Sequence, residues 1–106
     1  MRTEPRGAGV GDDDDRLVVQ LEGDLDVVSA GPVGDQLCSL VDEGELIIEV
    51  DCGAVTFIES RGLAMMARVQ RLANESGCRL TWRSLPLDAL RTIHLSGLDE
   101  YLRIEA

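Results

Sequence analysis

Apolar positions divide the chain into short strand-like runs and longer helix-like segments. Residues 46–50 form a short run rich in β-branched residues, which predicts a strand buried on both faces, and residues 16–21 and 79–83 are also read as strands. Residues 29–43 carry apolar side chains at helical spacing, and residues 63–73 consist of strong helix formers. These five segments therefore predict alternating strands and helices.

The segments between these elements carry turn and cap residues. A polar turn at residues 22–26 is expected to end the first strand, and Ser29 is a suitable N-cap for the helix that follows. A second apolar patch at residues 51–58 follows a glycine break, and we expect it to be a loop that leads to the next helix. Gly77 is predicted to close that helix in a left-handed conformation.

The remaining sequence predicts one more helix and one more strand. The third helix is expected to begin just before Pro86, to run through His94 and to stop at Gly97, and residues 101–104 read as a terminal strand. Strands alternating with helices over short links predict βαβ crossovers. The fold class is therefore α/β, with a single domain and a mostly parallel sheet of four to five strands packed against helices.

Residues 1–15 differ in composition from the rest of the chain. They contain several glycines and four consecutive aspartates, which predicts a flexible acidic N-terminal arm before a domain at residues 16–106. A short strand near residues 8–10 is the alternative, although nothing alternates there.

Charge and hydropathy restrict the kind of partner. The 106 residues include 20 Asp and Glu but only 10 Lys and Arg, a formal net charge of −10, so we expect no nucleic-acid partner and favour a basic protein surface. No apolar run approaches the roughly 18 residues that a membrane helix needs. Membrane insertion is thus not expected. The chain also lacks the pattern of a secretory signal, so we expect a cytoplasmic location.

The sequence offers little for catalysis. His94 is the only histidine and has apolar neighbours, and the glycine-rich phosphate-binding motifs are absent. Asp24, Asp26 and Asp51 fall at strand ends, where they could hold magnesium or act as acids and bases, but turn and cap roles explain them as well. We therefore expect no enzyme activity, no cofactor and no metal site.

Three widely spaced cysteines, Cys38, Cys52 and Cys78, form no zinc pattern and are expected to be free thiols. If the strands beside them are parallel neighbours, Cys52 and Cys78 lie at opposite ends of the sheet. A strand of five residues spans roughly 16 Å, so no disulfide between them is expected.

Ser60 has an unusual setting between an apolar strand and a helix. Its hydroxyl could simply cap the free N–H groups of the helix. The same position lies at the positive end of the helix dipole, where a negative group is favourable. The sequence alone leaves both a capping and a regulatory role open.

Three short motifs resemble those of a known family. Ile58-Glu59-Ser60-Arg61-Gly62-Leu63 is similar to the Asp-Ser-Ser/Thr-Gly-Leu motif of anti-sigma factor antagonists, whose fold is the STAS domain. Gly23-Asp24-Leu25-Asp26 resembles the family's Gly-Glu-Leu-Asp turn, and Leu95-Ser96-Gly97-Leu98 resembles its Ser-Gly-Leu near the C-terminus. The resemblance extends from about residue 16 to residue 104. Glu59 replaces the usual Asp, and Arg61 replaces a small residue.

The resemblance implies a STAS-like domain and a phosphorylation switch at Ser60. In that family the unphosphorylated protein binds an anti-sigma factor with serine kinase activity and frees the sigma factor. Phosphorylation releases the partner, and a separate protein phosphatase resets the switch. The positions that this implies for partner binding surround Ser60 in two segments: Asp24, Leu25, Asp26 and Val27 in the turn, and Glu59, Ser60 and Arg61 in the motif.

The helix after Ser60 carries two stripes. Leu63, Met66, Val69 and Ala73 share one face and should pack on the sheet. A second stripe consists of Arg61, Met65, Arg68 and Leu72. It is predicted either to contact the partner, which is the interpretation that we adopt, or to border the core. An alternative function for the whole chain is that of a STAS subunit of a membrane transport complex that binds the complex's ATPase.

Overall fold

The computed structural model describes residues 8–13 and 16–105, and for residues 8–13 it describes the backbone alone. Five strands form one sheet in the order β1-β2-β3-β4-β5. The strands are β1 (Ala8–Asp13), β2 (Arg16–Leu25), β3 (Ile47–Ile58), β4 (Arg79–Arg83) and β5 (Ile104–Glu105). The helices are α1 (Ala30–Asp42), α2 (Ser60–Ser76), α3 (Leu87–Leu95) and the 3-10 helix η1 (Leu98–Glu100).

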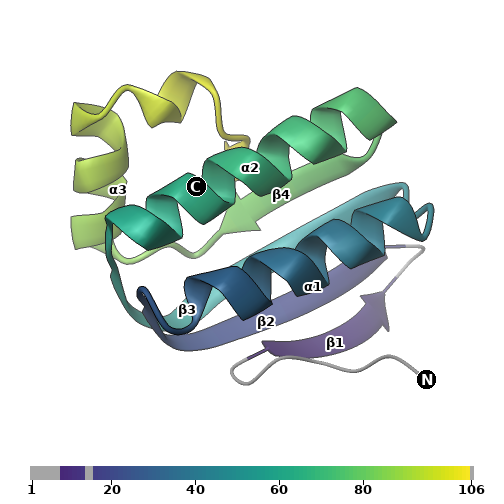
Figure 1. The fold of residues 1–106 in the computed structure, drawn as a ribbon, viewed down its shortest axis with the longest axis horizontal. Coiled ribbons are helices and arrows are strands. Elements are labelled where there is room, and N and C mark those ends of the chain that lie inside the picture. The colour runs from purple at the N-terminus through teal and green to yellow at the C-terminus, as the bar shows by residue number, and fades with distance from the viewer. Residues whose placement is uncertain (1–7, 14–15, 106) are drawn as a thin grey trace.

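Strands β2 to β5 run parallel, and each crossover contains a helix. Helix α1 joins β2 to β3, α2 joins β3 to β4, and α3 with η1 joins β4 to β5, while β1 pairs antiparallel with β2. Helices α1 and α2 lie side by side over one face of the sheet, and α3 lies at one end of it (Figure 1). This architecture confirms the predicted α/β class with a mostly parallel sheet.

The core lies between the sheet and helices α1 and α2. Alternate residues of β2, β3 and β4 point into it, and the apolar faces of the two helices cover them. Its fully enclosed members include Leu17, Val19 and Leu21 of β2, Ile48 and Val50 of β3, Leu80 and Trp82 of β4, Leu37 and Leu40 of α1, and Met66 and Val69 of α2. The predicted packing faces of the first two helices are therefore confirmed.

The buried side-chain amide of Gln70 connects α2 to β4 and to the segment before β5. Gln70 is 1% exposed, and its Oε1 accepts hydrogen bonds from Trp82 Nε1 and from the backbone N–H of Arg103, both at 3.0 Å. Its Nε2 donates to the Leu80 carbonyl at 3.4 Å. Because both ends of the amide are bonded, its burial is compensated and α2 has a fixed position relative to β4.

Strands β2 and β3 extend further than the sequence suggested. The expected polar turn at residues 22–26 belongs to β2 as far as Leu25, and the expected break at Gly53 lies inside β3. The pairing of β2 with β3 shifts register twice, so β3 contributes an extra residue at each shift. Such bulges bend a strand without ending it, which explains why glycine and polar residues do not stop these strands.

The two edge strands of the sheet, β1 and β5, also differ from expectation. Residues 8–13, expected to belong to an N-terminal arm, pair with β2 along their whole length. Strand β5 has only two residues, because a turn after η1 occupies residues 101–102 of the segment expected to be a strand at residues 101–104. The flexibility of the arm stays a prediction, and residues 1–7 and 14–15 lie outside the described part of the chain.

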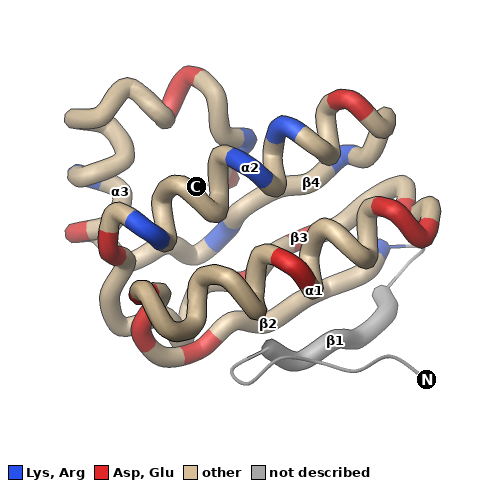
Figure 2. The backbone as a smooth tube through the Cα atoms, in the orientation of Figure 1, with Lys and Arg blue, Asp and Glu red and all other residues tan. Residues whose placement is uncertain are grey.

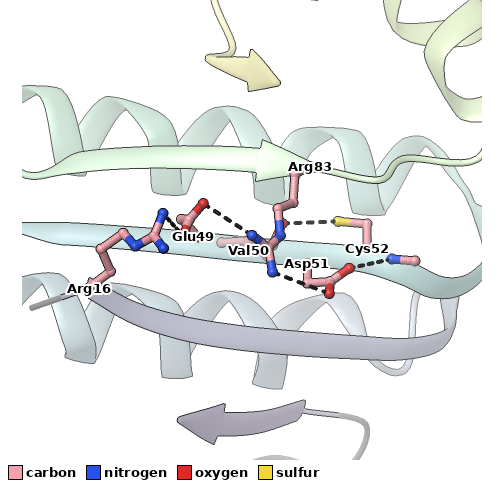
Figure 3. A network of polar contacts seen from close by, with 7 residues as sticks. Arg16, Glu49, Val50, Asp51, Cys52 and Arg83 are labelled. Atoms are coloured by element: carbon pink, nitrogen blue, oxygen red, sulfur yellow. Dashed lines mark hydrogen bonds and ion pairs between the residues drawn. The ribbon is translucent and has the colours of Figure 1, made fainter. Parts of the chain in front are cut away.

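The opposite face of the sheet carries an ion-pair network that crosses three strands (Figure 3). Glu49 of β3 is 6% exposed, with Oε2 2.9 Å from Arg16 Nη1 and Oε1 3.2 Å from Arg83 Nη1. Arg83 Nη2 also lies 3.7 Å from Asp51 Oδ2. The pairing of both carboxylates with arginines explains how charge is tolerated within an expected buried strand.

Candidate functional site

The candidate site lies where β2 and β3 end and α1 and α2 begin. Leu25 and Ile58 pair at the ends of the two parallel strands, and the Glu59 N–H then donates to the Leu25 carbonyl at 3.0 Å. Crevices at the carboxyl ends of parallel strands are the usual binding regions of α/β sheets. The fold thus brings the turn after β2 next to the Ser60 motif, as the resemblance implied.

Ser60 is the first residue of α2 and is exposed. Glu59, not Ser60, is the N-cap residue, and no side chain caps the helix. Of the two roles that the sequence left open, capping of α2 by the Ser60 hydroxyl is therefore ruled out, because the backbone of Ser60 is already helical. The hydroxyl is free to face solvent or a partner, at the end of a helix where negative charge is favourable.

Gly62 lets the start of α2 approach the end of β2 closely. A Cβ on Gly62 would lie 2.8 Å from the Leu25 carbonyl oxygen and 2.8 Å from Ile58 Cγ2. Contacts this short do not occur without displacement. The glycine of the motif is therefore required for the position of Ser60 relative to the turn after β2.

The acidic side chains of the turn are bonded within the protein. Asp24 accepts a hydrogen bond from Thr56 Oγ1 at 2.5 Å, across β2 and β3. Asp26 Oδ1 accepts from the backbone N–H groups of Ser29 and Val28, both at 3.0 Å, and these bonds hold the pKa of the Asp26 carboxyl below its usual value. Asp26 therefore serves to shape the turn.

Ser29 precedes α1, as expected, but its hydroxyl does not cap the helix. It donates to the Asp24 carbonyl at 2.6 Å and accepts from the Asp26 N–H at 3.0 Å. Together with the Asp26 carboxylate, these bonds fix the four-residue turn before α1. Leu25 is 1% exposed, so it anchors the turn in the core and does not reach its surface.

Exposed apolar side chains lie near Ser60, at the carboxyl ends of β2 and β3. Val27 and Val28 at the tip of the fixed turn are 65% and 77% exposed, and Phe57, which pairs with Asp24 in the register, is 57% exposed. Large apolar side chains gathered on a surface favour a protein-binding site. Sequence reasoning missed Phe57, because it read residues 51–58 as an apolar loop, and it missed Val28, because the turn that the resemblance indicated ends at Val27.

A cavity of about 760 Å³ opens beside the turn. It is lined by Glu22, Gly23, Asp24, Asp26, Val28, Ser29, Pro32 and Ala54. Acidic residues lie in this turn and also at the far end of α1, whereas basic residues recur along α2 (Figure 2). Charges of both signs therefore occur near the start of α2, where Ser60 lies.

The second stripe of α2 is only partly a surface. Met65 is 4% exposed and belongs to the core, and Leu72 is half-buried against it. The expectation that this stripe is a partly apolar contact surface is wrong for Met65, because α1 packs against that side of α2. The exposed members are Arg61 and Arg68, and Arg68 Nη2 lies 3.3 Å from Asp35 Oδ1.

Other candidate groups lie apart from this edge. Asp51 pairs with Arg83 on the opposite face of the sheet, and exposed His94 has Nδ1 2.8 Å from Asp99 Oδ2. Cys52 is buried, which raises the pKa of its thiol to about 12. The parallel register of β3 and β4 puts Cys52 and Cys78 at opposite ends of the segment over which these strands pair, and all three cysteines are free.

The described residues contain no candidate membrane span and no candidate metal cluster. None of their helices is both long and apolar enough to cross a membrane. Within the same residues, no three His, Cys, Asp or Glu side chains are grouped so that they could share a metal ion.

Comparison with known proteins gives a consistent result. The family model described as "Mlab, STAS domain" matches residues 8–104. An anti-sigma factor antagonist from Mycobacterium paratuberculosis is 30% identical, with a TM-score of 0.75 over 92% of this chain and 82% of that one. SpoIIAA, an anti-sigma factor antagonist, in its unphosphorylated form is 15% identical, with a TM-score of 0.75 over 93% of this chain and 88% of that one.

A candidate anti-sigma factor antagonist from Thermotoga maritima is 18% identical, with a TM-score of 0.84 over 93% of this chain and 86% of that one. The match of the family model over most of the chain agrees with the order of strands and helices and with the motif at the start of α2. The chain therefore belongs to the STAS domain family, which includes these anti-sigma factor antagonists.

Proposed function

We propose that this protein is an anti-sigma factor antagonist that is switched by phosphorylation of Ser60. The observation that carries the proposal is the exposed Ser60 hydroxyl at the first residue of α2, between an apolar turn and a row of arginines. In the unphosphorylated form the protein binds an anti-sigma factor with serine kinase activity, and the sigma factor is freed. A protein phosphatase restores this form.

The similarity to the Mycobacterium paratuberculosis antagonist supports the general role, and one similar structure is a phosphorylated form of SpoIIAA from Bacillus. Neither the kinase nor the phosphatase belongs to this chain, so its own role is non-catalytic. Its work is to bind a partner in one state and to release it in the other.

Phosphorylation of Ser60 suits the protein itself. A phosphate adds a charge of about −1.5 to −2, and a negative charge near a helix N-terminus is favourable by roughly 0.3 to 1 kcal/mol. The fold should therefore stay unchanged. The partner has no such benefit, because an unpaired charge enclosed in an interface costs about 3 to 5 kcal/mol. Local blocking thus suffices for release.

The phosphorylated residue is the direct test. Purified anti-sigma factors with serine kinase activity, from the organism that encodes this chain, are incubated with the protein and ATP, and the product is mapped by mass spectrometry. We expect one phosphate on Ser60, and none in Ser60→Ala. Ser76→Ala, at the other end of α2, is the matched control and should be phosphorylated like the wild type.

Phosphate on another residue, or none with any of these kinases, would contradict the switch. The alternative function, a STAS subunit bound to the ATPase of a membrane transport complex, needs the same fold but no phosphate on Ser60. Retention of such an ATPase in a pull-down, together with an unmodified Ser60, would favour that alternative.

A further inference from the structure

A shallow groove separates the first turns of α1 and α2. Its volume is about 270 Å³, and its lining includes Ala30, Gly31, Ala64 and Met65, with Arg61 and Arg68. Ala30 and Met65 are buried, at 5% and 4% exposure. The groove is thus an apolar hollow with two guanidinium groups among its lining.

Gly34 allows the two helices to approach closely beside this groove. A Cβ on Gly34 would lie 2.3 Å from Arg68 Nη2 and 2.7 Å from Met65 Cγ. The bare backbone of α1 therefore makes room for the Arg68 side chain, which lies over it. This packing restricts where the Arg68 guanidinium can lie, and a preorganised cation binds with a smaller entropy cost.

The cations of this helix face differ in how they are neutralised. Arg71 pairs with Glu75 at 3.6 Å, and Arg68 pairs with Asp35 at 3.3 Å, in contacts that are both exposed. Arg61 has no ion-pair partner among the side chains that the structure describes. Exposed pairs contribute only about 0.2 to 1 kcal/mol, so Arg68 can exchange Asp35 for another anion at little cost.

The groove is lined by arginines although the chain carries a net charge of −10. An acidic partner is repelled by most of the surface, whereas this groove attracts it locally. Acidic side chains line the turn after β2, whereas Arg61 and Arg68 line the groove, so charges of both signs occur near the start of α2. Complementary charges of this kind set the orientation of a bound protein.

We infer that the groove between α1 and α2 receives an acidic segment of the partner protein, whose carboxylates pair with Arg61 and Arg68. A volume of about 270 Å³ is below that of typical small-molecule pockets, about 300 to 1,000 Å³, but holds an apolar side chain between two carboxylates. The inference rests on the proposed function and names the chemistry of the partner at one side of Ser60.

Charge reversal at Arg61 tests the inference. Binding of the purified anti-sigma factor kinases is measured by calorimetric titration for the wild type, Arg61→Glu and Arg79→Glu. The control Arg79→Glu makes the same change in net charge on an exposed residue at the start of β4, at the opposite edge of the sheet. We expect Arg61→Glu to lower affinity at least about tenfold, and Arg79→Glu less than about threefold.

The same variant separates binding from folding. A glutamate in the first turn of α2 is favourable for the helix, so Arg61→Glu should melt at or slightly above the wild-type temperature while binding more weakly. The difference in affinity between wild type and Arg61→Glu should shrink when salt is raised from about 50 mM to about 500 mM, because salt screens exposed charge pairs.

Each outcome identifies which claim fails. If the wild type binds a kinase and Arg61→Glu binds it equally well or more tightly, the acidic segment is wrong and the proposed function stands. If the wild type binds none of the anti-sigma factors, the proposed function is wrong and the inference fails with it. If Arg79→Glu weakens binding as much as Arg61→Glu does, the effect comes from the net charge, and the inference is also wrong.

Discussion

Asp26 illustrates how a single side chain acquires a role that its motif does not specify. The family resemblance assigned it to partner binding, yet its carboxylate accepts hydrogen bonds from the turn that precedes α1. The valines that it holds outward are the exposed groups. The sequence could suggest that this turn matters, but it could not separate the residue that builds the turn from those that face outward.

The lowered pKa of Asp26 predicts a pH dependence of stability. Because the folded-state value lies below the ordinary value of 3.8, ionised Asp26 stabilises the fold above the unfolded-state pKa, and this stabilisation is lost as pH falls through the folded-state pKa. Asp26→Asn removes the charge. The difference in unfolding free energy between wild type and variant should be largest above about pH 5 and should shrink toward pH 3.

Urea unfolding of both proteins across this pH range measures the difference directly. A difference that stays constant from neutral to acid pH would show that the hydrogen bonds to the turn do not depend on the charge of Asp26. Comparison with the variant cancels the titration of the other carboxylates of this acidic chain.

Glu49 lies beyond the reach of a local sequence pattern. It occurs within the apolar run at residues 46–50, and its burial depends on Arg16 and Arg83, each more than 30 residues away in the chain. The run was correctly read as a strand, but the polar character of its second face follows from side chains of neighbouring strands. Only the parallel register brings these three residues together.

At the scale of elements, periodicity predicted the helices and the order of the strands well. The spacing of buried positions in α1 and α2 agrees with the packed faces, and Gly77 closes α2 with a φ of +74°. The ends of β2 and β3 were missed, because bulges let glycine and polar residues continue within a strand. Met65 was placed on the exposed stripe, since the sequence does not tell how closely α1 approaches α2.

Gly62 gives an element-scale prediction. Ala is normally better than Gly within a helix, yet a Cβ here would meet the Leu25 carbonyl and Ile58. We expect Gly62→Ala to lower stability by about 1 to 3 kcal/mol through overpacking. Gly31→Ala in α1 is the matched control, because its Cβ would meet nothing within 4 Å, and it should change stability by less than about 1 kcal/mol, because the gain from replacing glycine is offset by the restriction that Pro32 places on the residue before it.

Chemical denaturation of the two alanine variants measures both effects. If Gly62→Ala were as stable as Gly31→Ala, the start of α2 would tolerate displacement from β2, and the close approach would not be what positions Ser60. A loss of stability confined to Gly62→Ala supports the role of the motif glycine.

At the scale of the whole molecule, the residues that stabilise the sheet lie apart from the exposed residues near Ser60. The packed core and the ion pairs across β2, β3 and β4 hold the sheet, whereas the edge at Ser60 carries exposed apolar side chains between acidic and basic surfaces. A partner that covers this edge must enclose Ser60. On the proposed function, a phosphate at that position would oppose binding without any change in the fold.

The sequence predicted the position of Ser60 at the start of α2 from the apolar segment before it and the helix formers after it, and the structure adds what surrounds it. Phe57 and Val28 were missed, because exposure of an apolar side chain depends on which elements cover it. The cavity beside Asp24 arises from strands and a turn that meet only in the folded chain. A site formed by segments that are distant in the sequence cannot be predicted from the local spacing of residues.

The most direct test of the switch is a calorimetric titration of the anti-sigma factor kinase with Ser60→Glu, Ser60→Ala and the matched control Ser76→Glu. We expect Ser60→Glu to bind about 100-fold more weakly, equivalent to about 2.8 kcal/mol, while it melts near the wild-type temperature. Ser60→Ala should bind like the wild type and should not be released by ATP, and Ser76→Glu should bind normally. Wild-type affinity in a folded Ser60→Glu variant would contradict the switch.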